Sequence, residues 1–572
     1  MNFEITPDNK PYLDARGKVI LNACPGSGKT TAVSYKLTTL TTECENEFGR
    51  YAGIACLSFT NVAKDEIANT YEKIKVSRLH YPHIVSTIDS FVNQYITLPF
   101  YHLLGKSTIR PSILNTVAFL DDMYWGNFRN KRNQLLKVSY PPSKIKIEID
   151  GSHSFDGHKP NPTIVNSEVF RKYAKSIKKW QVENGYLNND DATFIAAYLL
   201  ETYPSIGRSL VQRFPYIIVD EAQDTSEIQY KIFDLLIDAG LSNIEFVGDP
   251  YQSLYEFREA RPDLFIQRFN DTSEWQATRL THCRRSSQSI ISMYSIFRSV
   301  GEEPIISACN HETNNEVHVI RYNENDFSSL TTKYQGLVDE NSLNYILVRG
   351  GTHLERFGVK PVSEEPWKNS LAKTLLNAQR HFSMGNSKTC IDELRMFLAE
   401  ITLPAANFKD KKNEEQKLKE DIDLNIKLFE FVKNMPDIND TLENWTTIMT
   451  TYIKNNLGFS VDLQLKQKGA KFYSQNLKDL LFPKVEMIFP ISTIHKVKGM
   501  TFDSVLVVLS KKSSGEQISL SDFIKPTGLP NEKQRMLYVA LSRPKSLCCL
   551  AIPQDFSEEQ IQVQLGANIR FV

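Results

Sequence analysis

The feature that most constrains this chain is the segment ACPGSGKTT at residues 23–31, because of what stands on either side of it. An apolar run, KVILN from Lys18, precedes the segment, and a stretch of helical character follows it. This glycine and lysine spacing between a strand and a helix is typical of a phosphate-binding loop. Gly26 and Gly28 let backbone amides converge on phosphate oxygens, and the helix amino terminus adds positive potential. The sequence therefore predicts an α/β fold that binds a nucleotide.

Two side chains of the loop have individual predicted roles. Lys29 is expected to reach the β and γ phosphates of ATP, and Thr30 is expected to ligate Mg²⁺. The nucleotide-binding residues predicted from this loop are Ala23, Cys24, Pro25, Gly26, Ser27, Gly28, Lys29, Thr30 and Thr31.

A run of acids follows a second apolar strand, in YIIVDEAQD at residues 216–224. The acids would emerge at the carboxyl edge of a sheet, where ligands bind in open α/β folds. Asp220 is predicted to hold Mg²⁺, and Glu221 is predicted to activate the attacking water. An acidic cluster after a strand is also compatible with a simple turn, but the phosphate-binding loop upstream favours the catalytic interpretation.

Short apolar runs recur in two separate regions of the chain, which predicts two parallel sheets. Each set is interrupted by an insert of mainly helical pattern, at about 92–213 and about 365–486. The first insert is rich in basic and aromatic residues, a composition that an exposed helix face would also explain. The predicted strands are 18–23, 53–59, 83–87, 216–220 and 244–249 in the first set, and 316–322, 345–349, 488–493, 504–510 and 546–552 in the second.

The composition of the chain argues against several kinds of site and segment but does not identify a function. The 572 residues are enough for about three to five compact units. Lys plus Arg equals Asp plus Glu at 67 each, so any nucleic-acid contact must come from a local basic groove. The eight cysteines contain no C-x-x-C pair, which argues against a zinc or iron–sulfur site. Without a signal-like amino terminus or a long apolar run, we expect a cytoplasmic protein with no membrane segment.

The segment FVGDPYQSLYEFREA at residues 246–260, together with DEAQD, resembles motifs II and III of the UvrD-like helicases, the UvrD, PcrA and Rep group of superfamily 1. The resemblance implies that Gln252 senses the γ-phosphate and that Tyr255, Phe257 and Arg258 contact DNA. Tyr255 and Phe257 are two positions apart, so in an extended segment they share a face suited to stacking on unpaired bases. The alternative is an aromatic pair buried in the core.

Further matches follow in the family's order along almost the whole chain. LSFTNVAKDEI at 57–67 resembles motif Ia, and STIDSF at 86–91 resembles motif Ib with Asp89 in place of His. STIHKVKGMTFDSVLVV at 492–508 resembles motif V, with Thr501 where the family usually has Glu. The DNA contacts that these motifs imply are Phe59, Thr60, Asn61, Thr87, Ser90 and His495.

Two arginines are assigned to catalysis by the same resemblance. LTHCRRS at 280–286 aligns with motif IV and supplies Arg285 as a γ-phosphate contact, while EKQRMLYVALSRPK at 532–545 resembles motif VI and supplies Arg543 as an arginine finger. Such a finger stabilises the charge that develops on the transferring phosphoryl group. Ordinary surface salt bridges are the alternative for both residues.

Two departures concern the nucleotide base. Arg284 occupies the position of the aromatic residue that stacks on adenine, and Asn9 falls where the family has a glutamine that reads adenine. A guanidinium can also stack on a purine, so Arg284 is kept as a nucleotide contact together with Asn9. We expect a looser preference among nucleotides than the family shows.

The resemblance implies two RecA-like P-loop domains, 1A and 2A, with inserts 1B and a short 2B. The expected boundaries are 1–91 and 214–279 for 1A, 92–213 for 1B, 280–364 and 487–572 for 2A, and 365–486 for 2B. The expected cofactors are ATP and Mg²⁺, and the expected substrates are single-stranded and tailed duplex DNA.

The implied function is an ATP-dependent, 3′-to-5′ DNA helicase, with the direction resting on the resemblance alone. Three hypotheses stay open. The chain could act in DNA repair, or as a subunit resembling the helicase partner of the Gabija anti-phage system beside an OLD-family nuclease, or as a DNA-sensing ATPase switch with little unwinding. The chain ends soon after Lys545, so we expect any DNA cleavage to come from another polypeptide.

Overall fold

The computed structural model describes residues 3–105, 109–114, 120–124, 126–130, 133–156, 161–254, 259–309, 316–324, 326–339, 342–350, 366–368, 371–383, 387–403, 414, 418–419, 421–466, 477, 489–513, 515, 517–566 and 568–572. The chain divides into two compact units. The larger unit combines Met1–Gly350 with Ile488–Val572, and the smaller unit is Gly351–Met487. Each unit is described by itself.

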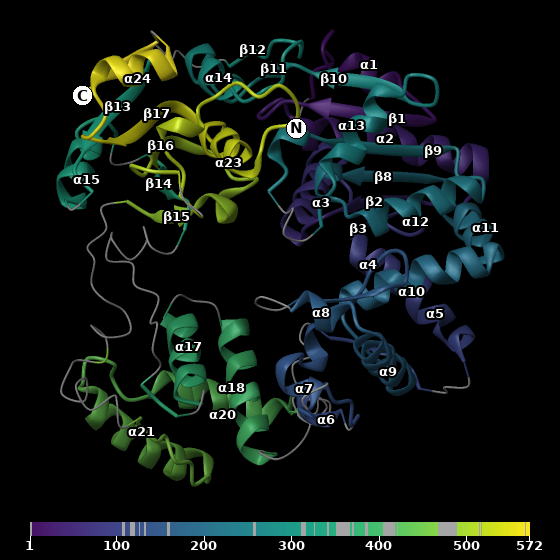
Figure 1. Cartoon of the computed structure of the whole chain (residues 1–572), viewed down its shortest axis with the longest axis vertical. Helices are drawn as coiled ribbons and strands as arrows, with labels where there is room; N and C mark the ends of the chain where they lie inside the picture. The colour runs from purple at the N-terminus through teal and green to yellow at the C-terminus, as the bar shows by residue number, and fades with distance from the viewer. Residues whose placement is uncertain are drawn as a thin grey trace. The chain divides into compact units, whose positions relative to one another are not determined.

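The first sheet of the larger unit has six strands in the order β10-β1-β9-β8-β2-β3, and every neighbouring pair is parallel (Figure 1). The strands are β1 (Lys18–Ala23), β2 (Ile54–Ser58), β3 (Ile84–Thr87), β8 (Tyr216–Asp220), β9 (Asn243–Gly248) and β10 (Gln276–Leu280). Every residue of β2 and β8 is buried, as expected for central strands covered on both faces.

Helices cover both faces of this sheet. Successive residues of β1 alternate between the two layers: Val19 and Leu21 pack in one hydrophobic cluster with α2 and α3, and Ile20 packs in another with α10 and α12. The helices are α1 (Lys10–Asp14), α2 (Lys29–Phe48), α3 (Asn61–Lys75), α4 (Ile88–Val92), α10 (Asn189–Thr202), α11 (Pro204–Arg213), α12 (Glu227–Asp238) and α13 (Pro262–Asn270).

The second sheet of the larger unit is also parallel and six-stranded, in the order β15-β14-β16-β17-β13-β18. Its strands are β13 (Val317–Tyr322), β14 (Asn344–Val348), β15 (Ile491–Thr493), β16 (Phe502–Val508), β17 (Pro544–Pro553) and β18 (Ile569–Phe571). Its helices are α14 (Gln288–Ser295), α15 (Phe327–Gln335), α23 (Glu532–Leu541) and α24 (Glu558–Leu565). A short ribbon of β11 (His282–Cys283) and β12 (Ile306–Ser307) lies between the two sheets in sequence.

The predicted fold class, α/β with two parallel sheets, is confirmed, and each of the ten predicted strands overlaps an observed one. Within the two six-stranded sheets two strands were missed, and both are at a sheet edge; the short strands of the two-stranded sheets were not predicted either. β10 has the sequence QATRL and β18 has the sequence IRF, so neither contains the apolar run that identifies a central strand.

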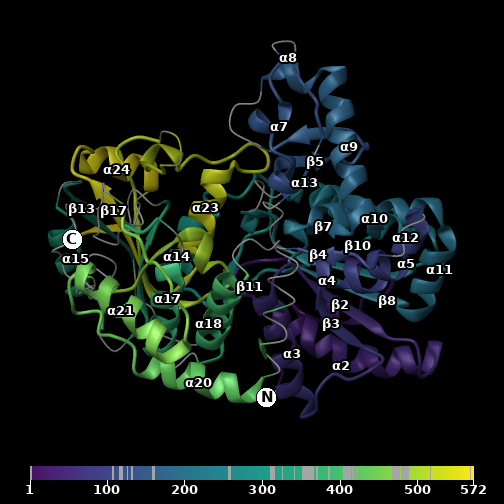
Figure 2. The same ribbon diagram turned by 90° about the horizontal axis from the view of Figure 1, so that it is seen from below.

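A compact group of elements with its own core follows α4 in the chain. Tyr140, Phe170 and Tyr173 belong to this core, which is rich in aromatic side chains. Figure 2 shows α7, α8, α9 and β5 grouped together. The elements of this group are α6 (Leu120–Met123), α7 (Leu136–Ser139), β5 (Ile145–Ile147), β6 (His153–Phe155), α8 (Pro162–Val165) and α9 (Glu168–Asn184). The same part of the chain contains α5 (Leu98–Phe100), β4 (Ser112–Ile113) and β7 (Tyr186–Leu187), whose residues Phe100, Ile113 and Leu187 pack with the core of the first sheet.

Helices α10 and α11 fall within the predicted insert 92–213, yet their buried residues share the core of the first sheet. Ile195, Leu199 and Leu210 are in one cluster with Ile217 and Val219 of β8. The amphipathic pattern of a helix reports that one face is buried, but it does not report against which partner. These two helices therefore belong structurally to the layer of the first sheet.

The smaller unit contains the predicted insert 365–486, and its described residues are mainly helical. Its helices are α17 (Leu371–Ser383), α18 (Ser387–Thr402), α20 (Ile422–Lys433) and α21 (Leu442–Leu457). They enclose a core in which Trp367 and Trp445 meet edge to face, and the Trp367 indole donates a hydrogen bond to the Thr446 hydroxyl at 3.1 Å. Among the helices that the structure describes, none is long and apolar enough to cross a membrane.

Candidate nucleotide and DNA site

The loop between β1 and α2 has the backbone that phosphate binding requires. Gly26 and Gly28 have φ angles of 72° and 84°, in the left-handed region that favours glycine. A Cβ at Gly26 would also lie 2.6 Å from the Cβ of Arg285, so this position needs glycine for space as well. Lys29 begins α2, a helix of 20 residues. The loop amides therefore lie at the positive end of a long helix dipole.

The other loop residues differ in exposure. Ala23, Cys24 and Pro25 are buried, and Thr30 and Thr31 are partly exposed. The Ser27 side chain is buried, and among the described residues its hydroxyl has no hydrogen-bond partner. A buried hydroxyl without a partner is unfavourable in the free protein, so it indicates a place for an external oxygen ligand.

Lys29 lies against the two acids at the end of β8. Its Nζ is 2.6 Å from Oε1 of Glu221 and 3.4 Å from Oδ1 of Asp220. Burial alone would lower the pKa of Lys29, but the charges of Asp220 and Glu221 raise it above its ordinary value. Lys29 is therefore a permanent cation that neutralises the acidic pair before any nucleotide arrives.

The two acids respond differently to the same surroundings. Asp220 is 1% exposed, and within the described part of the chain neither carboxylate oxygen has a hydrogen-bond partner. Burial raises the pKa of Asp220 despite the opposing charge of Lys29. Burial would also raise the pKa of Glu221, but Lys29 and Lys498 outweigh that effect and lower it. Glu221 is therefore the acid held ionised, as a general base must be.

The backbone of Glu221 has a φ of 55°, in the left-handed region, although Glu221 is not a glycine. Such a conformation is unfavourable and persists only where surrounding contacts maintain it, most often at functional sites. Here the contacts come from Lys29 and from Gln223, whose side-chain amide donates to the second carboxylate oxygen of Glu221.

Gln223 is a residue that sequence reasoning missed. It is completely buried, and its amide oxygen accepts a hydrogen bond from the backbone N–H of Asp249 at 3.1 Å. Gln223 therefore connects the acids after β8 to the segment after β9. A Cβ at Gly248 would lie 2.4 Å from the Gln223 amide oxygen, which explains the glycine at that position. The letters DEAQD contain Gln223, but no spacing rule indicates which backbone group it meets.

The second sheet contributes two arginines to the same place. Nη2 of Arg543 donates to the side-chain oxygen of Gln252 at 2.7 Å, and Nη1 of Arg285 donates to the backbone oxygen of Ser542 at 2.8 Å. Burial, followed by the nearby charge of Arg285, lowers the pKa of Arg543 to about 9. A buried guanidinium whose charged form is disfavoured by burial and by a second guanidinium favours a bound anion. The surface salt-bridge alternative does not apply to Arg543, which is 1% exposed.

Other contacts join the segments that follow the two sheets. Lys498 forms an ion pair with Asp224, and both side chains are at most 10% exposed. The Tyr538 hydroxyl donates to Oδ2 of Asp249 at 3.2 Å, and the Gln252 amide donates to the same carboxylate at 2.8 Å. The predicted catalytic residues are therefore joined by one network that crosses from the first sheet to the second.

A pocket of about 880 Å³ opens beside this network. Residues from both sheets line it, among them Thr30, Phe59, Thr60, Glu221, Gln252, His495 and Lys498. The structure thus brings three of the predicted DNA-contacting residues, Phe59, Thr60 and His495, to one cavity with the catalytic side chains.

The remaining predicted DNA contacts have different surroundings. Asn61 is exposed at the start of α3, and Thr60 caps that helix by accepting from the Ala63 N–H. Thr87 caps α4, and its hydroxyl donates to that of exposed Ser90 at 2.7 Å. Tyr255, Phe257 and Arg258 lie outside the described residues.

The two residues predicted to contact the base are differently placed. Arg284 is exposed. Asn9 is 4% exposed, and its side chain accepts from the Thr6 N–H at 2.8 Å and donates to the Glu4 carbonyl at 2.9 Å. Because both polar atoms of Asn9 are engaged within its own turn, contact with a base would require that turn to open. The role of Asn9 in nucleotide binding stays a prediction.

These features define a P-loop nucleotide-binding protein built from two parallel α/β sheets. The sequence matches the UvrD/REP helicase N-terminal domain over residues 6–273 and the UvrD-like helicase C-terminal domain over residues 184–553. The chain belongs to the UvrD-like helicase family. The resemblance that the motifs predicted is confirmed at this level.

Individual relatives match only part of the chain. The ATP-dependent DNA helicase Rep of Buchnera aphidicola is 26% identical over 57% of this chain and 47% of its own length. The ATP-dependent DNA helicase PcrA of Leuconostoc citreum is 24% identical over 58% of this chain and 42% of its own length. The ATP-dependent DNA helicase srs2 of Schizosaccharomyces pombe is 27% identical over 47% of this chain and 31% of its own length. The chain thus spans less than half the length of each of these relatives.

Proposed function

We propose that this protein is an ATP-driven motor that moves along single-stranded DNA and unwinds duplex DNA in the 3′-to-5′ direction. The observation that carries the proposal is the contact between Arg543 and Gln252, because it links the second sheet to the catalytic acids of the first. An arginine supplied from a second domain makes hydrolysis depend on the relative position of the two sheets. That dependence is what a motor needs to turn hydrolysis into movement.

The proposed chemistry assigns one role to each charged group. Glu221, held ionised beside Lys29, accepts the proton of the attacking water. Lys29 leaves the carboxylates for the β and γ phosphates, and this exchange frees Glu221 to act. Arg285 and Arg543 stabilise the negative charge that develops on the phosphoryl group, an effect worth about 10³ to 10⁵ in rate for an arginine finger.

The residues at the end of β8 fit a magnesium ion. Apart from its ion pair with Lys29 at 3.4 Å, the buried Asp220 carboxylate has no hydrogen-bond partner in the described part of the chain, and Thr30 lies in the first turn of α2. Mg²⁺ prefers oxygen ligands and is usually held by one or two carboxylates together with substrate phosphates. Asp220 and Thr30 would hold the ion, which would supply positive charge to offset that of the phosphates.

For DNA, we propose the same residues that the family motifs indicate. Phe59, Thr60 and His495 line the pocket beside the catalytic network, which supports a path for the strand across both sheets. Further along this path we propose Asn61, Thr87, Ser90, Tyr255, Phe257 and Arg258. The domain assignments 1A, 1B, 2A and 2B are proposed on the same basis.

One experiment tests motor, polarity and unwinding together. ATP hydrolysis is measured with and without single-stranded DNA, and strand displacement is measured on duplexes with a 3′ or a 5′ tail. We expect stimulation by DNA and displacement of the 3′-tailed duplex, and no hydrolysis by Lys29→Ala. Hydrolysis that DNA stimulates without strand displacement would identify a switch, and displacement of the 5′-tailed duplex alone would overturn the proposed direction.

The biological role is proposed at the level of two alternatives, DNA repair or anti-phage defence beside an OLD-family nuclease. Co-purification of the chain with such a nuclease would select defence. Activity on tailed duplexes as an isolated chain, with no nuclease bound, would select repair.

A further inference from the structure

The residues that follow β9 of the first sheet are buried in the core of the second sheet. They are the short 3₁₀ helix η5 (Pro250–Gln252) and the two residues after it, together called the Gln252 segment. Tyr251 and Leu254 belong to one hydrophobic cluster with Tyr538 of α23. The ring centroids of Tyr251 and Tyr538 lie 5.6 Å apart. Helix α23 is therefore an element of the second sheet against which the Gln252 segment is packed.

Arg535, near the start of α23, is hydrogen-bonded to this segment inside the protein. Its Nε donates to the backbone oxygen of Ser253 at 2.7 Å, and its Nη1 donates to the backbone oxygen of Pro530, just before the helix. Arg535 is 1% exposed, and Ser253 is completely buried. Because a buried charge without hydrogen bonds is strongly unfavourable, Arg535 favours the arrangement in which both carbonyl oxygens stay within its reach.

The same helix positions Arg543, which follows its last turn. Nε of Arg543 donates to the backbone oxygen of Val539 at 2.9 Å, so the arginine side chain lies against the end of α23. Its Nη2 donates to the side chain of Gln252, the residue immediately before Ser253. Arg535 and Arg543 thus attach the two ends of one ten-residue helix to neighbouring residues of the Gln252 segment. Because such a helix moves as a unit, loosening the attachment at Arg535 also displaces Arg543.

We propose that Arg535 is a positioning residue for ATP hydrolysis, which holds α23 against the Gln252 segment and so keeps Arg543 at the catalytic site. The inference rests on the proposed function, because that function assigns Arg543 to the transferring phosphoryl group. Arg535 is not among the described residues that line the pocket beside the catalytic network, so it acts through Arg543 rather than on the nucleotide. The alternative role for Arg535 is stabilisation of the fold alone.

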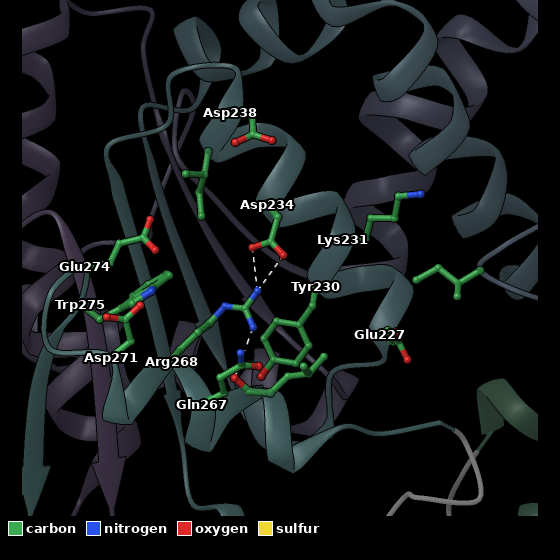
Figure 3. A pocket seen from close by; sticks show the side chains of 13 residues that line it. Glu227, Tyr230, Lys231, Asp234, Asp238, Gln267, Arg268, Asp271, Glu274 and Trp275 are labelled. Atoms are coloured by element: carbon green, nitrogen blue, oxygen red, sulfur yellow. Dashed lines mark hydrogen bonds and ion pairs between the residues drawn. The ribbon is translucent and has the colours of Figure 1, made fainter.

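A matched control arginine lies beside the first sheet. Arg268 of α13 forms an ion pair with Asp234 of α12 at 2.7 Å and lies over the ring of Tyr230, beside a pocket of about 540 Å³ (Figure 3). Its side chain is 13% exposed, so it is also largely buried. None of the described residues that line this pocket also lines the pocket beside the catalytic network. Arg268→Met therefore removes a buried guanidinium away from that network.

The first test compares the two methionine variants in steady-state ATP hydrolysis. We expect Arg535→Met to lower kcat by about 10- to 100-fold, the effect of losing one hydrogen bond from a charged group, and to change the KM for ATP by less than about twofold. Arg268→Met should keep kcat near that of the wild type while losing stability in urea unfolding. Equal loss of kcat in both variants, or no loss in Arg535→Met, would overturn the proposal.

The conservative variant Arg535→Lys gives a second comparison. A lysine retains a charged donor, but it lacks the planar fork that lets a guanidinium reach two carbonyl oxygens in fixed directions. We expect Arg535→Lys to recover part of the kcat that Arg535→Met loses. If Arg535→Met does not fold, Arg535→Lys and Arg268→Lys are compared instead, and an equal kcat in these two variants would overturn the proposal.

A double-mutant cycle separates positioning from a purely structural role. The residual hydrolysis of Arg543→Ala is measured in single turnovers, with and without Arg535→Met. If Arg535 acts through Arg543, adding Arg535→Met should have little further effect, because the side chain that it positions is already gone. If the two losses multiply, Arg535 acts independently of Arg543 and the proposal is wrong.

A readout without ATP keeps this inference distinguishable from the proposed function. In the nucleotide-free protein the amide of Gln252 donates to the Asp249 carbonyl at 2.9 Å, so its hydrogen exchange reports how firmly the Gln252 segment is held. Arg535→Met should accelerate exchange across 251–254, and Arg268→Met should not. Unchanged exchange would overturn the positioning role. Full hydrolysis by Arg543→Ala would instead overturn the proposed role of Arg543, while accelerated exchange would still show that Arg535 holds the segment.

Discussion

Replacing Gln223 by leucine tests whether the network behind the catalytic acid controls hydrolysis. The substitution keeps the approximate size of a fully buried side chain while removing its three hydrogen bonds, which include a long one of 3.4 Å to Oδ2 of Asp224. The backbone N–H of Asp249 loses its acceptor, and the Glu221 carboxylate loses a donor while keeping Lys29. Glu221 would then hold its strained backbone conformation with one contact fewer.

The expected magnitudes follow from the bonds to Asp249 and Glu221. A buried N–H left without an acceptor costs about 1–3 kcal/mol, which sets the expected loss of stability. A hydrogen bond to a charged group contributes about 1.5–3 kcal/mol. If that contribution is retained in the transition state, its loss lowers kcat by roughly 10- to 100-fold, since each 1.36 kcal/mol is a factor of ten. The KM for ATP should change little, because Gln223 does not line the pocket.

The assay is steady-state ATP hydrolysis at saturating single-stranded DNA, with urea unfolding to measure stability. Gln229→Leu is the matched control: Gln229 is also a buried glutamine, and it bonds the Ser226 N–H and the Asp89 carboxylate, away from Glu221. We expect a similar loss of stability in both variants and a large loss of kcat only in Gln223→Leu. A folded Gln223→Leu enzyme with kcat within about threefold of wild type would refute the reasoning.

Three other outcomes are expected. Gly248→Ala should lower kcat in the same assay as Gln223→Leu does, because the added methyl would lie 2.4 Å from the Gln223 amide oxygen; normal turnover would contradict this. Glu221→Gln should keep nucleotide affinity, measured by equilibrium binding, while single-turnover hydrolysis slows by orders of magnitude; retained hydrolysis would exclude Glu221 as the base. Burial raises the pKa of Asp224 to about 6, so the folded state binds that proton more tightly than the unfolded state, and its contribution to stability declines as pH rises from about 4 to about 6. Urea titrations should show that the free energy of unfolding of Asp224→Asn rises relative to that of the wild type between about pH 4 and pH 6. Above that window the difference should stay constant.

Sequence patterns predicted those elements whose composition is set by their own surroundings in a sheet. The central strands could be predicted because strands buried on both faces must be almost entirely apolar, as β2 and β8 are. The edge strands β10 and β18 could not, because an edge position tolerates polar residues. The boundary of the first insert was also beyond local patterns, since α10 and α11 bury their faces against the first sheet rather than within the insert.

In the candidate site too, the sequence predicted some features and gave no signal for others. The spacing around Lys29 predicted the loop, and the acids after β8 predicted a place beside it, which the distances from Lys29 to Asp220 and Glu221 agree with. The engagement of Asn9 within its own turn had no signal in the sequence, because a short amide side chain can serve a turn or a ligand equally well.

The sequence by itself determined the family, the two parallel sheets and the identity of the phosphate-binding loop, because each of these depends on residues that are only a few positions apart. Only the tertiary structure decided which distant side chains meet. Arg543 contacts Gln252 across 291 positions of the chain, Lys498 pairs with Asp224, and Gln223 joins Glu221 to Asp249. Such contacts depend on how two sheets pack against each other, and packing is a property of whole surfaces that no local spacing specifies.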